Sequence, residues 1–487
     1  MALNFPDNPT PGQQYTDPNN LIWEFNGVVW TPITGTVGTS GFSGFSGYSG
    51  YSGTSGYSGI NGISGFSGSG SAIAASDEGN LLTNTVSSFN FVGTNVVATN
   101  VGGAVTLTIE PPVVYNNSAW TWGTGGNGAR GDNTGTGCTS SPGSVVGGFT
   151  DWCQIVVGGF GGATTGHGHA VRTNGTLWSW GYWGRGVLGD NGTYGVTRSS
   201  PVSVTGGFTD WCQVTANKFN TSFAAAVRQN GTAWAWACNN YGQLGDNTTT
   251  NRFSPVSVVG GFTNWCQVSA GDKHLLGVRT NGTLYAWGSG GSGQLGNNEA
   301  ANKSSPVSVI GGFTDWSQVA AGNSHSLGLR TNGTAWAWGD GSSGKLGNNC
   351  TTARSSPVSV IGGFTDWCQV SGGGEHSLAV RTNGSTWAWG SNSNGQLGDN
   401  TTVSKSSPVS VIGGFTDWCQ VSGGSTQSTG VRQNGTAWAW GIGEQGQLGD
   451  NTTVNKSSPV SVVGGFTDWC QVAAANGMSA GIRSTAT

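Results

Sequence analysis

The chain has 487 residues, of which 89 are glycine, and only 8% of its residues are charged. Its net charge is −4, and its lysines and arginines do not cluster. This argues against nucleic-acid binding, because neutralising phosphates needs a cluster of basic residues. We expect no membrane span, since no run of 18 apolar residues occurs. The first residues contain neither a basic nor an apolar signal region, so we expect no secretory signal.

Residues 1–34 begin with a proline-rich stretch and continue with the segment LIWEFNGVVW at residues 21–30. Two short apolar runs around Asn26-Gly27 predict a small β-hairpin, which needs a partner to be stable. The pattern FPDNP-x-x-GQ-x-YTDPN-x-x-x-W-x-F resembles the leading segment of structural proteins in tailed bacteriophages, particularly phages of cyanobacteria. This resemblance implies that the hairpin attaches the chain to other virion proteins.

Residues 35–71 are dominated by a strict triplet, in which glycine falls at every third position twelve times from Gly35 to Gly68. The third position is mostly serine and the triplets contain no proline. Glycine at every third residue suits three chains that share one axis, and such a stalk would span about 100 Å. We therefore expect a homotrimer in which these collagen-like triplets form an extended stalk or another ordered triplet structure. A flexible Gly/Ser linker is the alternative.

Residues 72–112 alternate between apolar and polar side chains at 89–92 and at 105–109, which predicts strands with one buried face. Forty residues bury little surface on their own. The DEG…FNFVG…GG-x-VTLTI pattern resembles small β-modules of phage tail fibres, where chains often trimerise. We interpret this segment as a small β neck module.

Residues 113–487 repeat one unit that starts with Asp-Trp, or once Asn-Trp, and the last four intervals are 51 residues long. Each unit holds four short runs rich in Val, Trp and Ser, with an Asn-Gly turn between the second and third. This is the pattern of a four-stranded propeller blade. The last unit lacks its third strand, and a lone SAWTWG at 118–123 precedes the first unit. We therefore predict an all-β, seven-bladed β-propeller closed by a composite blade, in which 118–146 pair with 468–487. The repeats start at Trp152, Trp211, Trp265, Trp316, Trp367, Trp418 and Trp469.

The motif AG-x-x-HSLGLRTNGTAWAWG, followed by G-x-LG and SSPVSV, resembles the regulator of chromosome condensation repeat. The resemblance implies a seven-bladed propeller and says little about activity, because this propeller hosts unrelated functions. A guanine-nucleotide exchange factor, a plant ultraviolet-B photoreceptor and a bacterial β-lactamase inhibitor protein share it. The photoreceptor's Gly-Trp-Arg-His-Thr signature is absent here.

The residue types that could carry chemistry follow the repeat, which favours structural roles. Histidine shares its register with phenylalanine, glutamine and methionine, so a metal ring is not expected, and His167 with His169 supplies only two ligands. Six cysteines share one register, where we expect small buried side chains. The Asp of LGDN suits an Asx turn better than a calcium cage. We expect no catalytic residue, no cofactor and no enzyme activity.

Length variation in the repeat is confined to one face of the expected ring. The loops between the first and second strands, and between the third and fourth strands, emerge on the same face of a four-stranded meander. They are extended or altered in the composite blade and in the two blades that follow it. We expect a binding surface there, because a few aromatic anchors dominate many contacts. Its candidate residues are Phe160, His167, His169, Tyr182, Trp183, Tyr194, Lys218 and Phe219.

The sequence thus predicts a virion appendage, a tail fibre or spike of a phage, whose propeller head binds a glycan or a protein on the host surface. Its location would be the virion or the extracellular space. The alternative is a purely structural decoration or a subunit of an extracellular filament.

Overall fold

The computed structural model describes residues 115–159, 165–182, 184–192, 195–219 and 221–486, together with seven short strands in the N-terminal part. The chain divides into two compact units, Met1–Phe45 and Ser46–Thr487. This division falls inside the glycine triplets, which lie outside the described residues, so the stalk stays a prediction. Where the structure describes the chain, its helices are 3-10 helices of three residues, and none of them could span a lipid bilayer.

The N-terminal strands form three separate small sheets. The first unit holds β1 (Gln14–Thr16), β2 (Ile22–Phe25) and β3 (Trp30–Pro32) in that order. β2 and β3 pair through Phe25 and Trp30, so the second strand of the expected hairpin starts later than Asn26-Gly27 suggested. The second unit begins with the pairs β4 (Ser76–Asp77) with β5 (Asn80–Leu81), and β6 (Val96–Val101) with β7 (Ala104–Ile109). The strand expected at 89–92 lies outside the described residues.

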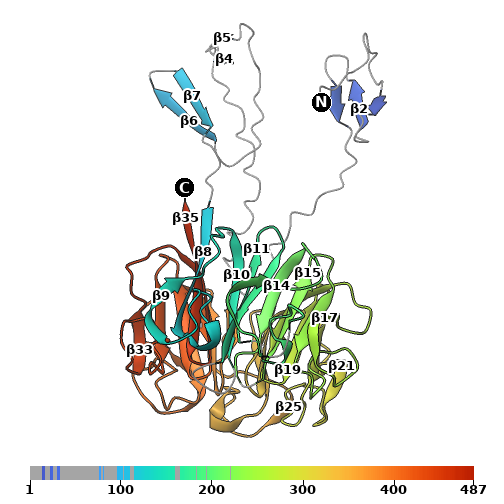
Figure 1. Cartoon of the computed structure of the whole chain (residues 1–487), viewed down its shortest axis with the longest axis vertical. Helices are drawn as coiled ribbons and strands as arrows, with labels where there is room; N and C mark the ends of the chain where they lie inside the picture. The colour runs from blue at the N-terminus through green and yellow to red at the C-terminus, as the bar shows by residue number, and fades with distance from the viewer. Residues whose placement is uncertain are drawn as a thin grey trace. The chain divides into compact units, whose positions relative to one another are not determined.

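Seven four-stranded antiparallel sheets form the propeller, and six of them use consecutive strands (Figure 1). We number these blades 1 to 6 in chain order. Blade 1 contains β10 (Trp152–Gly159), β11 (Gly166–Arg172), β12 (Leu177–Gly181) and β13 (Arg198–Ser203). Blade 2 contains β14 (Trp211–Ala216), β15 (Phe223–Arg228), β16 (Ala233–Ala237) and β17 (Arg252–Ser257). Blade 3 contains β18 (Trp265–Ala270), β19 (His274–Arg279), β20 (Leu284–Gly288) and β21 (Lys303–Ser308).

The later blades follow the same plan. Blade 4 contains β22 (Trp316–Ala321), β23 (His325–Arg330), β24 (Ala335–Gly339) and β25 (Arg354–Ser359). Blade 5 contains β26 (Trp367–Gly372), β27 (His376–Arg381), β28 (Thr386–Gly390) and β29 (Lys405–Ser410). Blade 6 contains β30 (Trp418–Gly423), β31 (Gln427–Arg432), β32 (Ala437–Gly441) and β33 (Lys456–Ser461). The short 3-10 helices are η1 (Gly126–Gly128), η2 (Gly184–Gly186) and η3 (Ser342–Gly344).

Blade 7 is the composite blade, and it closes the ring as the sequence predicted. Its strand order is β34 (Trp469–Ala475), β35 (Met478–Ala486), β8 (Tyr115–Thr124) and β9 (Cys138–Ser144). β35 pairs with β8 over nine residues, from Met478 opposite Gly123 to Ala486 opposite Tyr115. Strands from the two ends of the chain thereby cover edges that would otherwise be open to aggregation.

Tryptophan fills the space between blades. The Trp that starts each repeat is 1–3% exposed, and a second Trp in the third strand is fully buried in every blade. The indole Nε1 of this second Trp donates to a carbonyl of the preceding blade in six cases, for example Trp389 to Lys345 O at 2.9 Å. Each indole thus contributes apolar area and one hydrogen bond across a blade boundary.

A ring of seven glutamines joins the innermost strands. Each side-chain Oε1 accepts the backbone N–H of the first strand in the next blade at 2.7–2.9 Å, and Gln471 completes the circle on Ile155. First strands are edge strands, so their inward N–H groups need partners when buried. The side-chain amides supply them. The seven residues are Gln154, Gln213, Gln267, Gln318, Gln369, Gln420 and Gln471.

Candidate functional site

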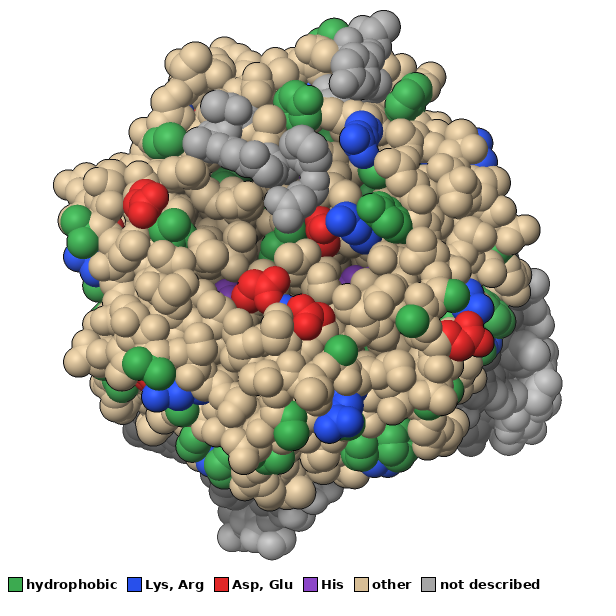
Figure 2. Space-filling view, turned by 90° about the horizontal axis from the view of Figure 1, so that it is seen from below, with side chains coloured by type: hydrophobic (Ala, Val, Ile, Leu, Met, Phe, Trp, Pro, Cys, Tyr) green, Lys and Arg blue, Asp and Glu red, His purple; other side chains and the backbone are tan. Residues whose placement is uncertain are grey.

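The propeller has two unlike faces, which we name by what they carry. The turn face holds the Asn-Gly turns between second and third strands and the GGFTD connections between blades. The loop face holds the first–second and third–fourth loops. β8 enters and β35 ends at the turn face, where Tyr115 pairs with Ala486 (Figure 1). Figure 2 shows the opposite face, which is the loop face.

The turn face is nearly the same in every blade. In blade 1, the Arg172 guanidinium lies 2.7 Å from the Asp151 carboxylate and 4.2 Å from the centre of the Phe149 ring. The same arrangement recurs in the other blades, with Asn264 in place of Asp in blade 3. The Arg and Asp charges of this face therefore pair within their own blades.

The centre of the loop face is closed by the first–second loop of blade 2. The Lys218 ammonium donates to Gly423 O of blade 6 at 3.2 Å, and Asn476 N of blade 7 donates to Lys218 O at 3.1 Å. The backbone N–H of Thr221 donates to the buried Asp272 carboxylate of blade 3 at 2.9 Å. Acidic side chains gather around the centre of this face in Figure 2. The loop thus ties four blades together across the ring axis.

Two of the residues expected to contact a partner therefore lie inside the propeller. Lys218 is 7% exposed and Phe219 is 2% exposed, because their loop crosses the ring instead of projecting from it. The interpretation of these two side chains as surface contacts is wrong.

The placement expected for His167 and His169 is also wrong. Both lie on strand β11 rather than in the loop, since that strand begins at Gly166, and both are fully buried. Their rings meet edge to face with centroids 5.2 Å apart, and their ring nitrogens have no hydrogen-bond partner among the described residues. Burial lowers the pKa of His167 to about 3 and that of His169 well below its ordinary value.

The other three histidines link neighbouring blades. Nε2 of His274, His325 and His376 lies 2.9–3.0 Å from a serine hydroxyl of the next blade. Each serine donates its own proton to a backbone carbonyl, so Nε2 must carry the histidine proton. Burial lowers the pKa of His274 and His376 to about 3. These histidines are neutral structural donors, and the described residues contain no group of three metal-ligating side chains.

The repeated cysteines differ from the expectation of small buried side chains. Cys153 and Cys368 are exposed and the other four are half-buried, because each sits where the pairing register shifts between the Trp and the Gln of the first strand. Each thiol donates to a carbonyl of the second strand at 3.3–3.4 Å. Partial burial raises the pKa of the half-buried Cys419 and Cys470 thiols to about 11. All nine cysteines of the chain are free.

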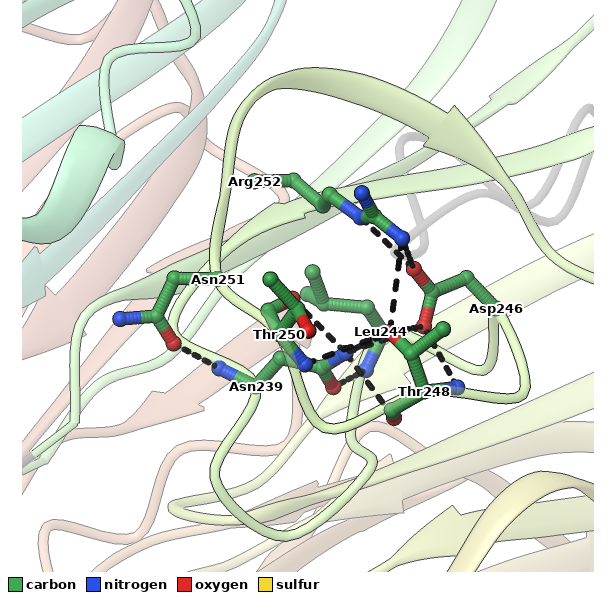
Figure 3. A network of polar contacts seen from close by, with 7 residues as sticks. All are labelled: Asn239, Leu244, Asp246, Thr248, Thr250, Asn251 and Arg252. Carbon is green, nitrogen blue, oxygen red and sulfur yellow. Dashed lines mark hydrogen bonds and ion pairs between the residues drawn. The ribbon is translucent and has the colours of Figure 1, made fainter.

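Polar networks hold the third–fourth loops in shape. In blade 2 the Asn239 amide donates to Asp246 Oδ1 at 3.0 Å and to two loop carbonyls at 3.1 Å (Figure 3). Asp246 Oδ1 accepts the N–H of Thr248 at 3.1 Å, which is the Asx turn that LGDN predicted, and its other oxygen pairs with Arg252. Asn392 organises the loop of blade 5 in the same way. These loops are preorganised surfaces.

The remaining candidate residues belong to two loops of blade 1: Phe160 to the first–second loop, and Tyr182, Trp183 and Tyr194 to the third–fourth loop. Tyr182 is half-buried and described, whereas Phe160, Trp183 and Tyr194 lie outside the described residues. Next to the third–fourth loop the structure shows a hollow that sequence reasoning did not find. It lies between blades 1 and 2 and contains Phe208 and Trp234 in its wall.

Comparison with known proteins extends the description of the propeller. A family model described as RCC1-like domain matches residues 118–482. The ultraviolet-B receptor UVR8 of Arabidopsis thaliana is 29% identical over 289 residues, which cover 58% of this chain and 64% of UVR8. The probable E3 ubiquitin-protein ligase HERC6 of Homo sapiens is 35% identical over 202 residues, which cover 39% of this chain and 20% of HERC6. The chain therefore spans less than two thirds of these relatives.

Solved structures agree on the fold. Yeast RCC1 (Prp20) bound to Kap60 superposes with a TM-score of 0.64 and 19% identity, covering 77% of this chain and 90% of that one. Human WBSCR16 gives a TM-score of 0.65 with 18% identity, covering 76% of this chain and all of that one. At these identities the likeness concerns the fold alone.

Proposed function

Because the chain belongs to the RCC1-like domain family, whose propeller serves unrelated activities, we propose that its propeller is a binding head and not a catalyst. The head would belong to a phage virion appendage and would attach to the host surface. The matched family covers only residues 118–482, so the phage assignment rests on the N-terminal sequence patterns. The segment 1–34 would join other virion proteins, and the glycine triplets would join three chains.

The asymmetry of the two faces carries this proposal. The chain enters the propeller at the turn face through β8, and the loop face is the opposite side of the ring. By strand order, the extended third–fourth loop of blade 1 and the altered third–fourth loop of blade 7 belong to that loop face, in neighbouring blades. A receptor-binding head needs its variable surface at the end remote from its anchor.

A structural role in a virion or an extracellular filament is the second candidate. The near-identity of the turn face around the ring favours it, because a repeated surface suits a building block. Binding to cells distinguishes the two roles.

The test uses the full chain labelled with a fluorophore and added to host cells. We expect saturable binding that is lost when Tyr182, Trp183 and Tyr194 are all changed to alanine. In the control, Val403 and Val454 are both changed to alanine. These two valines are exposed, to about the same extent as each other, in the third–fourth loops of blades 5 and 6. It should bind like the unchanged chain. Undiminished binding by a folded triple variant, or no binding by the unchanged chain, would contradict the proposal.

A further inference from the structure

A hollow of about 300 Å³ opens between blades 1 and 2. It is lined by Asn191, Thr205, Phe208, Trp234, Ser254 and Pro255. None of these side chains is charged. Its size is at the lower end of the range for small-molecule sites, and its mixture of aromatic rings with a few polar groups is typical of them.

Two aromatic rings form the apolar wall of the hollow. The ring centroids of Phe208 and Trp234 are 5.1 Å apart, and both residues are half-buried, so part of each ring remains accessible. The Arg228 guanidinium lies 3.9 Å from the centre of the Phe208 ring, and the Trp234 Nε1 donates to Thr232 Oγ1 at 3.0 Å. The rings are therefore fixed in place before any ligand arrives.

This boundary departs from the repeat at two positions. Thr205 stands where the other six boundaries carry valine or isoleucine, and Phe253 stands where all the other blades carry serine. The Thr205 hydroxyl donates to Gly189 O at 2.7 Å, which leaves its oxygen lone pairs as acceptors. Phe253 is 46% exposed.

The serine lost at Phe253 changes the environment of Asn191. At three other boundaries this serine donates to the equivalent asparagine at 3.2–3.3 Å, in the pairs Ser199 with Asn133, Ser355 with Asn298 and Ser406 with Asn349. A phenylalanine cannot donate in this way. Asn191 is exposed, so its amide can both donate to and accept from a ligand.

We infer that this hollow binds a neutral sugar ring of a glycan. One face of a pyranose presents C–H groups that pack on an aromatic ring, and its rim presents hydroxyls for Asn191, Thr205 and Ser254. A phosphate or carboxylate would lose its hydration without meeting a positive charge in the lining. The inference rests on the proposed function in one respect, that the glycan belongs to the host surface.

The experiment titrates the full chain with a panel of neutral monosaccharides and disaccharides and follows tryptophan fluorescence and heat of binding. Thr205→Ile introduces the residue found at three other boundaries, so it should fold, narrow the hollow and remove the Thr205 hydroxyl. Val259→Ile makes a comparable addition at the boundary between blades 2 and 3. We expect at least one sugar to bind the unchanged chain and the Val259→Ile variant equally, and to bind Thr205→Ile at least tenfold more weakly.

The outcomes separate this inference from the proposed function. No binding by any neutral sugar, or equal binding by Thr205→Ile and the unchanged chain, overturns the sugar site. Attachment of the unchanged chain to cells, with no binding of any neutral sugar by that chain, would overturn the inference and leave the proposed function standing. Sugar binding without attachment to cells would overturn the proposed function and leave the site standing.

Discussion

Acid should unfold the propeller well above the pH at which its carboxylates become protonated, because all five histidines are buried and neutral. Desolvation is the main cause of their lowered pKa values, and Lys345 near His325 and Lys218 near His376 lower those two further. In the unfolded chain each histidine titrates near its ordinary value of about 6.5. Below that pH the unfolded state binds more protons than the native state, so stability falls as pH falls, until the folded pKa values are reached.

The size of this effect follows from the shifts. One proton costs about 1.4 kcal/mol of stability per pH unit, so five histidines together cost up to ~7 kcal/mol per unit between pH 6 and 4. A domain is stable by only about 5–15 kcal/mol. The accumulated cost reaches about 5 kcal/mol near pH 6 and about 15 kcal/mol near pH 4.3, so the propeller should lose its fold between these two values.

Urea denaturation followed by tryptophan fluorescence at pH 7, 6, 5.5 and 5 measures this dependence. His274→Gln introduces glutamine, the residue that blade 6 carries at the equivalent position (Gln427). This variant should reduce the slope of stability against pH by about one fifth, because one of the five histidines is removed. Stability that stays flat between pH 6.5 and 5, or a His274→Gln slope equal to that of the unchanged chain, would refute the reasoning.

Three further predictions concern closure and assembly. Gln369→Leu removes the hydrogen bonds to Val421 N at 2.8 Å and Val421 O at 3.0 Å, and should lower the free energy of unfolding by about 2–5 kcal/mol. The control Ser410→Ala should change the free energy of unfolding by less than about 0.5 kcal/mol. A similarly small effect of Gln369→Leu would contradict the role of the glutamine ring. A chain that ends before Met478 should fail to fold cooperatively, because β34 and β8 would expose their edges, and an unchanged melting transition would count against composite closure. Light scattering should give a trimer for the full chain and a monomer for a chain that starts at Val113, and a monomer in both cases would exclude the stalk.

Much of the fold could be predicted from the sequence, because each blade repeats the same contacts. The register of Trp120 and Trp122 before the first complete repeat was enough to predict that β8 joins the last blade. The glutamine ring could have been found in the same way, since Gln follows the Trp by two positions in all seven copies. Its function was not apparent because these hydrogen bonds join residues 52–60 positions apart, or 316 at the closure.

The candidate site was less accessible to sequence reasoning. The loop face could be predicted from strand order, but the direction of the 217–222 loop could not, because it depends on contacts with blades 3, 6 and 7. His167 was expected in the first–second loop, although Gly166 already pairs with Gly159 in the sheet. The hollow forms where Thr205 and Trp234, on neighbouring blades, come together, and the sequence does not show this contact. The sequence shows only that Thr205 and Phe253 depart from the repeat.

The central claim, that this chain is a virion appendage with its propeller outermost, is tested most directly by immunogold electron microscopy of purified phage particles with an antibody against the propeller. The account predicts gold at the tips of tail fibres or spikes. Particles that carry no label, from a lysate in which the free protein is detected, would contradict it.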